Sequence, residues 1–150
     1  MGVYSNVKTD IKKQELIGKK RKSEPVSLII DKKYNDFHYL VITEEYGKLF
    51  KQKACLIAYA ELIKSFSDLE KIIIDGDLRE PLQEELKQIL YPNKYGILAV
   101  AKADMNYKVV NMADQIANLI HRDYKRPTRL KKYLPHLITP KIEDYLSLLE

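Results

Sequence analysis

The sequence predicts an α/β fold, in which a mixed sheet carries helices on both faces. Two apolar runs, KIIIDGDL at residues 71–78 and YGILAVAKAD at residues 95–104, have the pattern of strands buried on both faces. Each run precedes a segment whose apolar residues recur with helical spacing. Upstream, VSLIID at 26–31 and FHYLVITEEYG at 37–47 favour antiparallel strands. The expected order, β-β-β-α-β-α-β-α, fits one five-stranded mixed sheet.

The individual elements follow from local signals. Residues 26–54 are expected to form an antiparallel three-strand meander, in which Gly47 permits a tight reversal into KLFKQKA. CLIAYAELIKSF, at residues 55–66, has helical spacing, and Pro81 is expected in the first turn of the helix after KIIIDGDL. VVNMADQIANLIHRDY predicts a long helix, and Thr139 with Pro140 predicts the start of a last one.

Composition limits the class of protein. A chain of 150 residues is long enough for one core, and residues 1–25 are expected to be a basic arm in front of a domain at 26–150. The 26 basic and 21 acidic residues leave a net charge of +5, which mildly favours polyanionic partners. The single Cys55 excludes a disulfide framework within the chain and favours a reducing cytoplasm. No apolar run has the length of a membrane helix, so no membrane partner is expected.

Several aspartates stand where strands are expected to end. A carboxylate at the end of a strand covered on both faces is costly without a partner, so Asp75 is interpreted as a metal ligand in preference to an Asp-Gly turn residue. Asp31 ends the first apolar run, where a turn residue and a ligand are equally compatible with the pattern. On the long helix, Asp114 shares one flank with Asn118 and His121, at the edge of the apolar face.

The element order and the places of Asp31, Asp75 and Asp114 resemble the ribonuclease H-like fold. KAD followed by KVVNMADQIANLIHRD is similar to the tail of type 2 ribonucleases H, and the resemblance covers most of residues 26–124. Those enzymes open with Asp-Glu and a Gly-Arg-Gly loop that reads the ribonucleotide, whereas here Lys32, Lys33 and Tyr34 follow Asp31. The chain therefore looks most like archaeal RNase H-like single-strand exonucleases, which implies a nuclease domain over residues 26–150.

A nuclease of this kind needs converging carboxylates. Two divalent cations generate hydroxide and stabilise the leaving oxygen, and Mg²⁺ or Mn²⁺ selects carboxylate ligands. The resemblance implies Asp31, Asp75 and Asp114 as the catalytic ligands. Glu61 and Asp123 are further candidates for metal ligands, and each has an ordinary alternative. Glu61 could form a surface ion pair with Lys64, and Asp123 could contact an arginine. Asp104, at the end of the run KAD, is a candidate for an outer metal ligand on the same footing as Glu61. His121 is a candidate proton shuttle or a plain surface residue.

The segment RDYKRPTRLKKY, residues 122–133, combines six cations and two tyrosines with one aspartate. Cations follow phosphates and rings stack on bases, so this mixture suits single-stranded nucleic acid, although a solvated charged face has the same composition. The residues predicted to bind nucleic acid are Lys32, Lys33, Tyr34, Lys125, Arg126, Arg129, Lys131 and Lys132.

The sequence therefore favours a metal-dependent single-strand-specific exonuclease. DNA is the expected substrate, with RNA left open, and 3′-to-5′ polarity is implied by the resemblance alone. Two alternatives stay open: a ribonuclease H that cuts RNA–DNA hybrids, and a non-catalytic nucleic-acid-binding module of the same fold. The pattern does not distinguish a monomer from a homo-oligomer.

Overall fold

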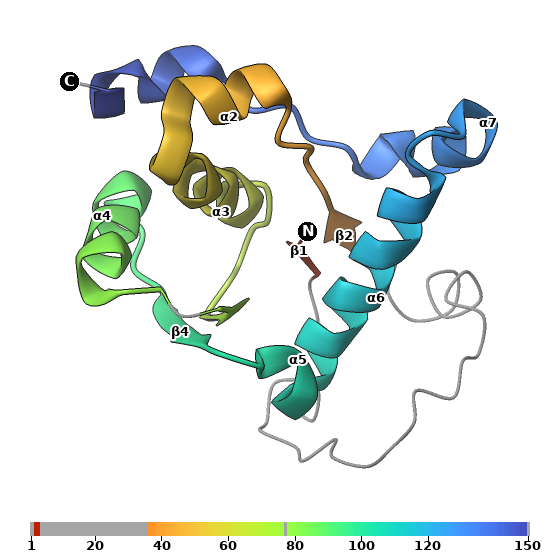
Figure 1. Ribbon diagram of the computed structural model, residues 1–150. Helices are drawn as coiled ribbons and strands as arrows, with labels where there is room; N and C mark the ends of the chain where they lie inside the picture. The colour runs from red at the N-terminus through yellow and green to blue at the C-terminus, as the bar shows by residue number, and fades with distance from the viewer. Residues whose placement is uncertain (1, 4–35, 77, 150) are drawn as a thin grey trace.

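The computed structural model describes residues 2–3, 36–76 and 78–149 (Figure 1). The described chain is a mixed α/β structure that is mostly helical and contains a small two-stranded parallel sheet. Several predicted features lie outside the described residues: the basic arm apart from Gly2 and Val3, the strand at 26–31, and the candidate site residues Asp31, Lys32, Lys33 and Tyr34.

The parallel sheet pairs β3 (Lys71–Asp75) with β4 (Gly96–Val100), in the register Lys71↔Gly96 to Asp75↔Val100. The connection between them runs through α4 (Glu80–Leu90), which carries Pro81 in its first turn, where a missing backbone N–H costs nothing. The two predicted strands and this helix are confirmed.

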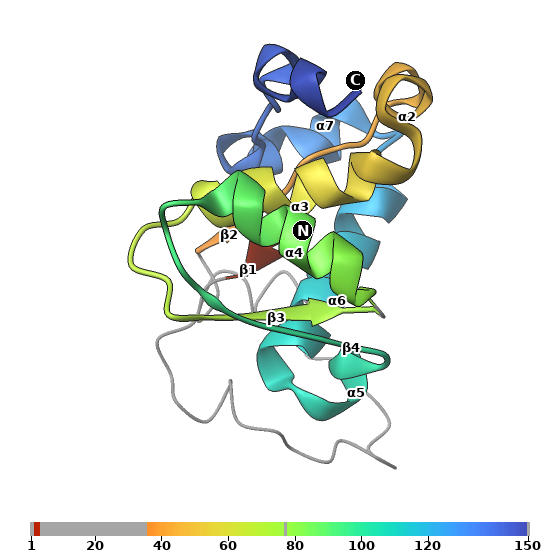
Figure 2. The same cartoon turned by 90° about the vertical axis from the view of Figure 1, so that its left-hand side faces the viewer.

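Helices cover both faces of this sheet, as the apolar runs predict. Because side chains alternate along a strand, Ile72 and Ile74 contribute to a cluster with α3 (Ala54–Lys64) and α4. Ile73 points to the opposite face and packs with residues of α5 (Ala103–Asn106) and the start of α6 (Lys108–Asp123). Figure 2 shows α3 and α4 on one side of the strands and α5 on the other.

The long helix α6 anchors a second cluster. Its inward residues Met112, Ile116 and Ile120 are spaced by four and pack with Phe37, Tyr39 and Tyr133. Phe37 belongs to β2 (Phe37–His38), which pairs antiparallel with β1 (Gly2–Val3). The predicted helix is confirmed over nearly all of its length.

The prediction of strands over residues 37–54 holds for β2 and is wrong beyond His38. After β2 the chain forms α2 (Glu44–Phe50) and the 3₁₀ helix η1 (Lys51–Lys53). Thr43 caps α2, because its Oγ1 accepts a hydrogen bond of 3.2 Å from the Tyr46 backbone N–H, and two glutamates follow it in the first turn. Gly47, predicted to reverse the chain, lies inside this helix. The described residues therefore contain no five-stranded sheet.

The C-terminal part consists of short helical segments: α7 (Pro127–Leu130), η2 (Lys131–His136) and η3 (Ile142–Leu149). The last predicted helix is thus a 3₁₀ helix that begins after Pro140. Its Tyr145 is 2 % exposed and packs against α2 and α3, so the end of the chain completes a third cluster. Among the described helices, none has the length and apolar character needed to cross a membrane.

Candidate functional site

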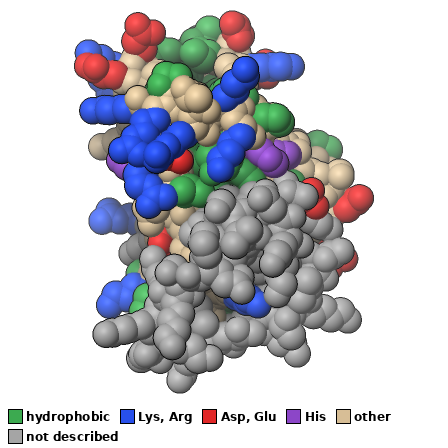
Figure 3. Space-filling view, turned by 90° about the vertical axis from the view of Figure 1, so that its right-hand side faces the viewer, with side chains coloured by type: hydrophobic (Ala, Val, Ile, Leu, Met, Phe, Trp, Pro, Cys, Tyr) green, Lys and Arg blue, Asp and Glu red, His purple; other side chains and the backbone are tan. Residues whose placement is uncertain are grey.

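Exposed cations gather where α6 passes into α7 and η2. We call residues 122–136 the basic platform. Every Lys and Arg side chain in it is exposed: Arg122, Lys125, Arg126, Arg129, Lys131 and Lys132. Figure 3, which faces the α6–α7 side of the molecule, shows Lys and Arg side chains gathered on its upper half. No acidic residue occurs between Tyr124 and Lys141, so nothing within that stretch neutralises these charges.

The basic platform is fixed to the core on its inner side. Tyr133 is 4 % exposed within the cluster of α6. The His136 ring stacks on Phe37 with centroids 3.9 Å apart, and its Nδ1 lies 2.9 Å from the Phe37 carbonyl oxygen. Backbone hydrogen bonds of 2.9 and 2.8 Å join Tyr39 to His136 and Ile138. These contacts hold the cations on an ordered support.

Two aromatic side chains belong to the basic platform. Tyr124, next to the end of α6, is 50 % exposed and is therefore accessible from solvent. Tyr133 is covered, and Lys132 Nζ lies 4.9 Å from its ring centroid. An accessible ring beside cations is the combination with which proteins stack unpaired bases.

Asp123 is the one acidic residue of the basic platform, and it is buried, with 5 % of its surface exposed. Arg129 Nη1 lies 3.8 Å from its Oδ1, which is an ion-pair distance and too long for a hydrogen bond. This position fits the alternative in which Asp123 contacts an arginine. Asp123, Arg129, Lys132 and Tyr133 line a pocket of about 390 Å³ together with Leu119 and Thr128.

Asp75 occupies the predicted position at the carboxyl end of β3, and it is exposed. Its Oδ1 accepts a hydrogen bond of 2.9 Å from the backbone N–H of Ala103, at the start of α5. Gly76 follows with a φ of 140°, a conformation that side chains with a Cβ rarely adopt, and its N–H bonds the Val100 carbonyl. The carboxylate is therefore positioned by the backbone and open to solvent.

The other predicted ligands lie on helices. Asp104 was expected at a strand end, but β4 ends at Val100 and a left-handed turn at Lys102 places Asp104 in the first turn of α5. Asp114 lies on α6, where it accepts a hydrogen bond of 3.5 Å from Asn118 Nδ2, and His121 is exposed further along that helix. Glu61 accepts a hydrogen bond from the Tyr145 phenol.

The metal centre is not assembled by the described residues. Among them, no group of three or more His, Cys, Asp or Glu side chains is placed to hold a metal ion. Asp31, which was expected to complete the site, lies outside the described part. Mg²⁺ and Mn²⁺ therefore remain an expectation of the sequence.

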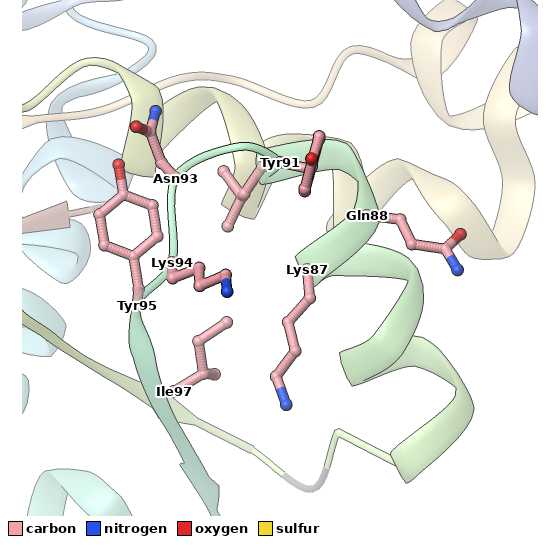
Figure 4. Close-up of a pocket in the computed structure, with 8 residues that line it drawn as sticks. Lys87, Gln88, Tyr91, Asn93, Lys94, Tyr95 and Ile97 are labelled. Atoms are coloured by element: carbon pink, nitrogen blue, oxygen red, sulfur yellow. The ribbon is translucent and has the colours of Figure 1, made fainter.

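A larger pocket, of about 610 Å³, was missed from the sequence. It lies between the end of α4 and the start of β4 and is lined by Lys87, Gln88, Leu90, Tyr91, Asn93, Lys94, Tyr95 and Ile97. Figure 4 shows the Lys94 ammonium group pointing into this space, whereas Lys87 extends along α4, where its Nζ lies 3.2 Å from Glu84 Oε1. The run LYPNKYG mixes tyrosines with a lysine, as RDYKRPTRLKKY does, and that composition was the available signal.

Comparisons with known proteins supply no relative: no protein-family model matches the chain, and searches of curated proteins and of solved structures return no match.

Proposed function

We propose that this protein binds single-stranded nucleic acid through the basic platform. The observation that carries this proposal is that the platform has an exposed, cationic side and an inner side that packs on the core. Its cations are all exposed, while Tyr133 and His136 fix the segment to the core. A face with exposed cations on an anchored backbone, and with no acid between Tyr124 and Lys141, attracts a polyanion without requiring the segment itself to fold on binding.

Single strands fit this surface better than duplexes. Tyr124 is half exposed, and an unpaired base can stack its full face on an accessible tyrosine ring. Base–aromatic stacking contributes about 1–3 kcal/mol per base, in addition to the release of counterions from each phosphate contact. A duplex keeps its bases stacked internally and offers the platform phosphates alone.

Fluorescence anisotropy with an end-labelled single strand, and with its duplex, tests this proposal. We expect the single strand to bind more tightly, and log K to fall linearly with log salt. Replacing Tyr124 with Ala should reduce the preference for the single strand, whereas the matched control Tyr91→Ala, at an exposed tyrosine outside the platform, should leave it unchanged. Equal affinity for both nucleic acids would contradict the single-strand claim, and no binding at low salt would contradict the proposal as a whole.

A second candidate is a metal-dependent 3′-to-5′ exonuclease of RNase H-like fold, acting on the strand that the platform holds. The observation that favours it is the position of Asp75, an exposed carboxylate at the carboxyl end of a parallel strand covered on both faces. With Asp31 and Asp114, it would supply oxygen ligands for Mg²⁺ or Mn²⁺, which activate water and stabilise the leaving oxygen.

Substitution of Asp75 by Asn tests this candidate. The amide oxygen can still accept the hydrogen bond from Ala103, so the fold should persist while a metal ligand is lost. Degradation of a single strand with Mg²⁺ should then fall by orders of magnitude, and Asp68→Asn, at an exposed aspartate with a φ of 57° that Asn also adopts, is the control. Undiminished cutting by Asp75→Asn would refute the assignment, and internal cutting of a hybrid's RNA strand would favour a ribonuclease H.

A further inference from the structure

The six residues Leu119, Asp123, Thr128, Arg129, Lys132 and Tyr133 line what we call the Asp123 pocket. It lies where the end of α6 meets α7 and η2, elements that Figure 1 shows side by side at one end of the molecule. Its volume of about 390 Å³ falls in the range of about 300–1,000 Å³ that small-molecule sites occupy. Its lining combines the apolar Leu119, which packs against the core, with two exposed cations, Arg129 and Lys132.

Two buried polar atoms of this pocket lack a hydrogen-bond partner among the described residues: Asp123 Oδ1 and the Tyr133 hydroxyl. A buried carboxylate oxygen without a hydrogen-bond donor costs more free energy than an unpaired neutral group, because a charged group loses more hydration energy on burial. Arg129 approaches this oxygen only to 3.8 Å. The site is therefore short of a hydrogen-bond donor.

Arg129 is the ion-pair partner of the carboxylate and is itself mostly exposed. The carboxylate side chain is 7 % exposed, whereas the Arg129 side chain is 62 % exposed and is free of core packing over most of its surface. A swing of the guanidinium toward solvent would open Asp123 to the pocket, and the same guanidinium would then face an anion at the mouth. Lys132 stands at the same rim.

The matching ligand carries an N–H donor at one end and a phosphate at the other. A nucleotide with an exocyclic amino group has both, because the amino group can donate to a carboxylate while the phosphate meets cations. Cytosine presents its N4 amino group, whereas uracil presents a carbonyl oxygen at the same position, which a carboxylate repels. Building on the proposed function, we propose that the Asp123 pocket receives one base of the bound strand and selects a base that bears an amino group.

The test compares oligodeoxycytidine with oligodeoxyuridine of equal length at one salt concentration. We expect the wild-type protein to bind the cytidine strand about tenfold more tightly, the lower part of the range for one discriminating side-chain contact. In Asp123→Asn the preference should disappear, because an amide can present either a donor or an acceptor to the base. The affinity for the uridine strand should be equal to or above the wild-type value, and Glu143→Gln, at an exposed glutamate of η3, serves as the control.

A second variant keeps the test valid if Asp123→Asn does not fold. Thr128 is exposed at the pocket wall, so Thr128→Trp should fill the pocket without disturbing the core and should also remove the preference for cytidine. Equal wild-type affinity for the two strands, or a preference that survives in either variant, would overturn the pocket assignment. Salt-dependent binding of both strands would then still support the platform, whereas no binding of either would contradict the platform and the pocket together.

Discussion

Tyr145 and Glu61 lie 84 residues apart in the chain and meet through a hydrogen bond from the phenol to the Glu61 Oε1. Lys64 Nζ also donates to the Tyr145 oxygen, over 3.3 Å, so the phenol joins an acid and a base of α3 to the C-terminal η3. This contact occupies a carboxylate that the sequence had offered as a metal ligand. In the described structure, Glu61 attaches the end of the chain to the core.

The Tyr145 contact leads to a prediction about stability. Replacing Tyr145 with Phe keeps the ring in its cluster but removes a hydrogen bond to a carboxylate, so the free energy of unfolding should fall by about 1.5–3 kcal/mol. Tyr91→Phe, at a side chain that is 75 % exposed, should change it by less than about 0.5 kcal/mol. Urea unfolding measures both, and equal stabilities of the two variants would contradict the role of the contact.

The raised pKa values of two buried tyrosines, Tyr145 and Tyr46, predict how stability responds to alkaline pH. Burial, together with the hydrogen bond to Glu61, raises the pKa of Tyr145, and burial raises the pKa of Tyr46 from 10.0 to about 12. A raised folded pKa stabilises the protein fully below the unfolded value of 10.0, and this stabilisation is lost as pH rises above it. The difference in unfolding free energy between wild type and Tyr145→Phe should therefore shrink above about pH 10. A difference that stays constant up to pH 12 would argue against the pKa shift.

Gly76 gives a test of the backbone next to Asp75. Its φ of 140° strains any residue with a Cβ, although, among the described residues other than its chain neighbours, no atom lies within 4 Å of the place a Cβ would take. Gly76→Ala should therefore destabilise the protein by about 1–3 kcal/mol through backbone strain alone. Gly96→Ala is the matched control, because Gly96 has no positive φ and its Cβ would make an ordinary contact of 3.7 Å. Thermal unfolding that ranks the two variants the other way would refute this reading of Gly76.

His136 tests whether the basic platform is anchored. His136→Ala removes the ring stack on Phe37 and the bond to its carbonyl oxygen, so it should lower stability by about 1 kcal/mol and speed hydrogen exchange at the amides of Tyr39 and Ile138. His121→Ala, at an exposed position, should leave exchange at both amides unchanged. Unchanged exchange in His136→Ala would mean that the other contacts suffice to hold the platform.

Long periodic segments could be predicted from the sequence, and short mixed ones could not. α3, α4 and α6 repeat apolar residues every three or four positions, and β3 and β4 contain the unbroken apolar runs 72–74 and 97–100, so local pattern and tertiary packing agree. FHYLVITEEYG satisfies a strand pattern as well as a helix pattern. The Thr43 cap and the two glutamates after it favour the helix. In the helix, Tyr46 and Phe50 lie one turn apart and are buried on the same face.

Part of the candidate site could likewise be predicted from the sequence, and part could not. The exposure of the basic platform and the place of Asp75 follow from composition and from the end of an apolar run. The burial of Asp123 follows from helical spacing, because Asp123 shares a face of α6 with Ile116 and Leu119. The pocket around it does not, because Arg129 and Tyr133 come from beyond the turn at α7. The pocket beside Lys94 likewise depends on how α4 returns to β4, which no local pattern encodes.

The salt dependence of strand binding tests the central claim, that the basic platform holds single-stranded nucleic acid. The test variant replaces Lys125, Arg126, Lys131 and Lys132 with Gln, and a control variant of equal charge replaces the exposed Lys48, Lys51, Lys71 and Lys141. Each lost phosphate contact should reduce the steepness of log K against log salt by about 0.7, so the loss of four contacts should weaken binding and reduce the slope of the test variant by up to about 2.8, while the control keeps most of the wild-type slope. A test variant with the wild-type slope, or a control that loses as much as the test variant, would contradict the account.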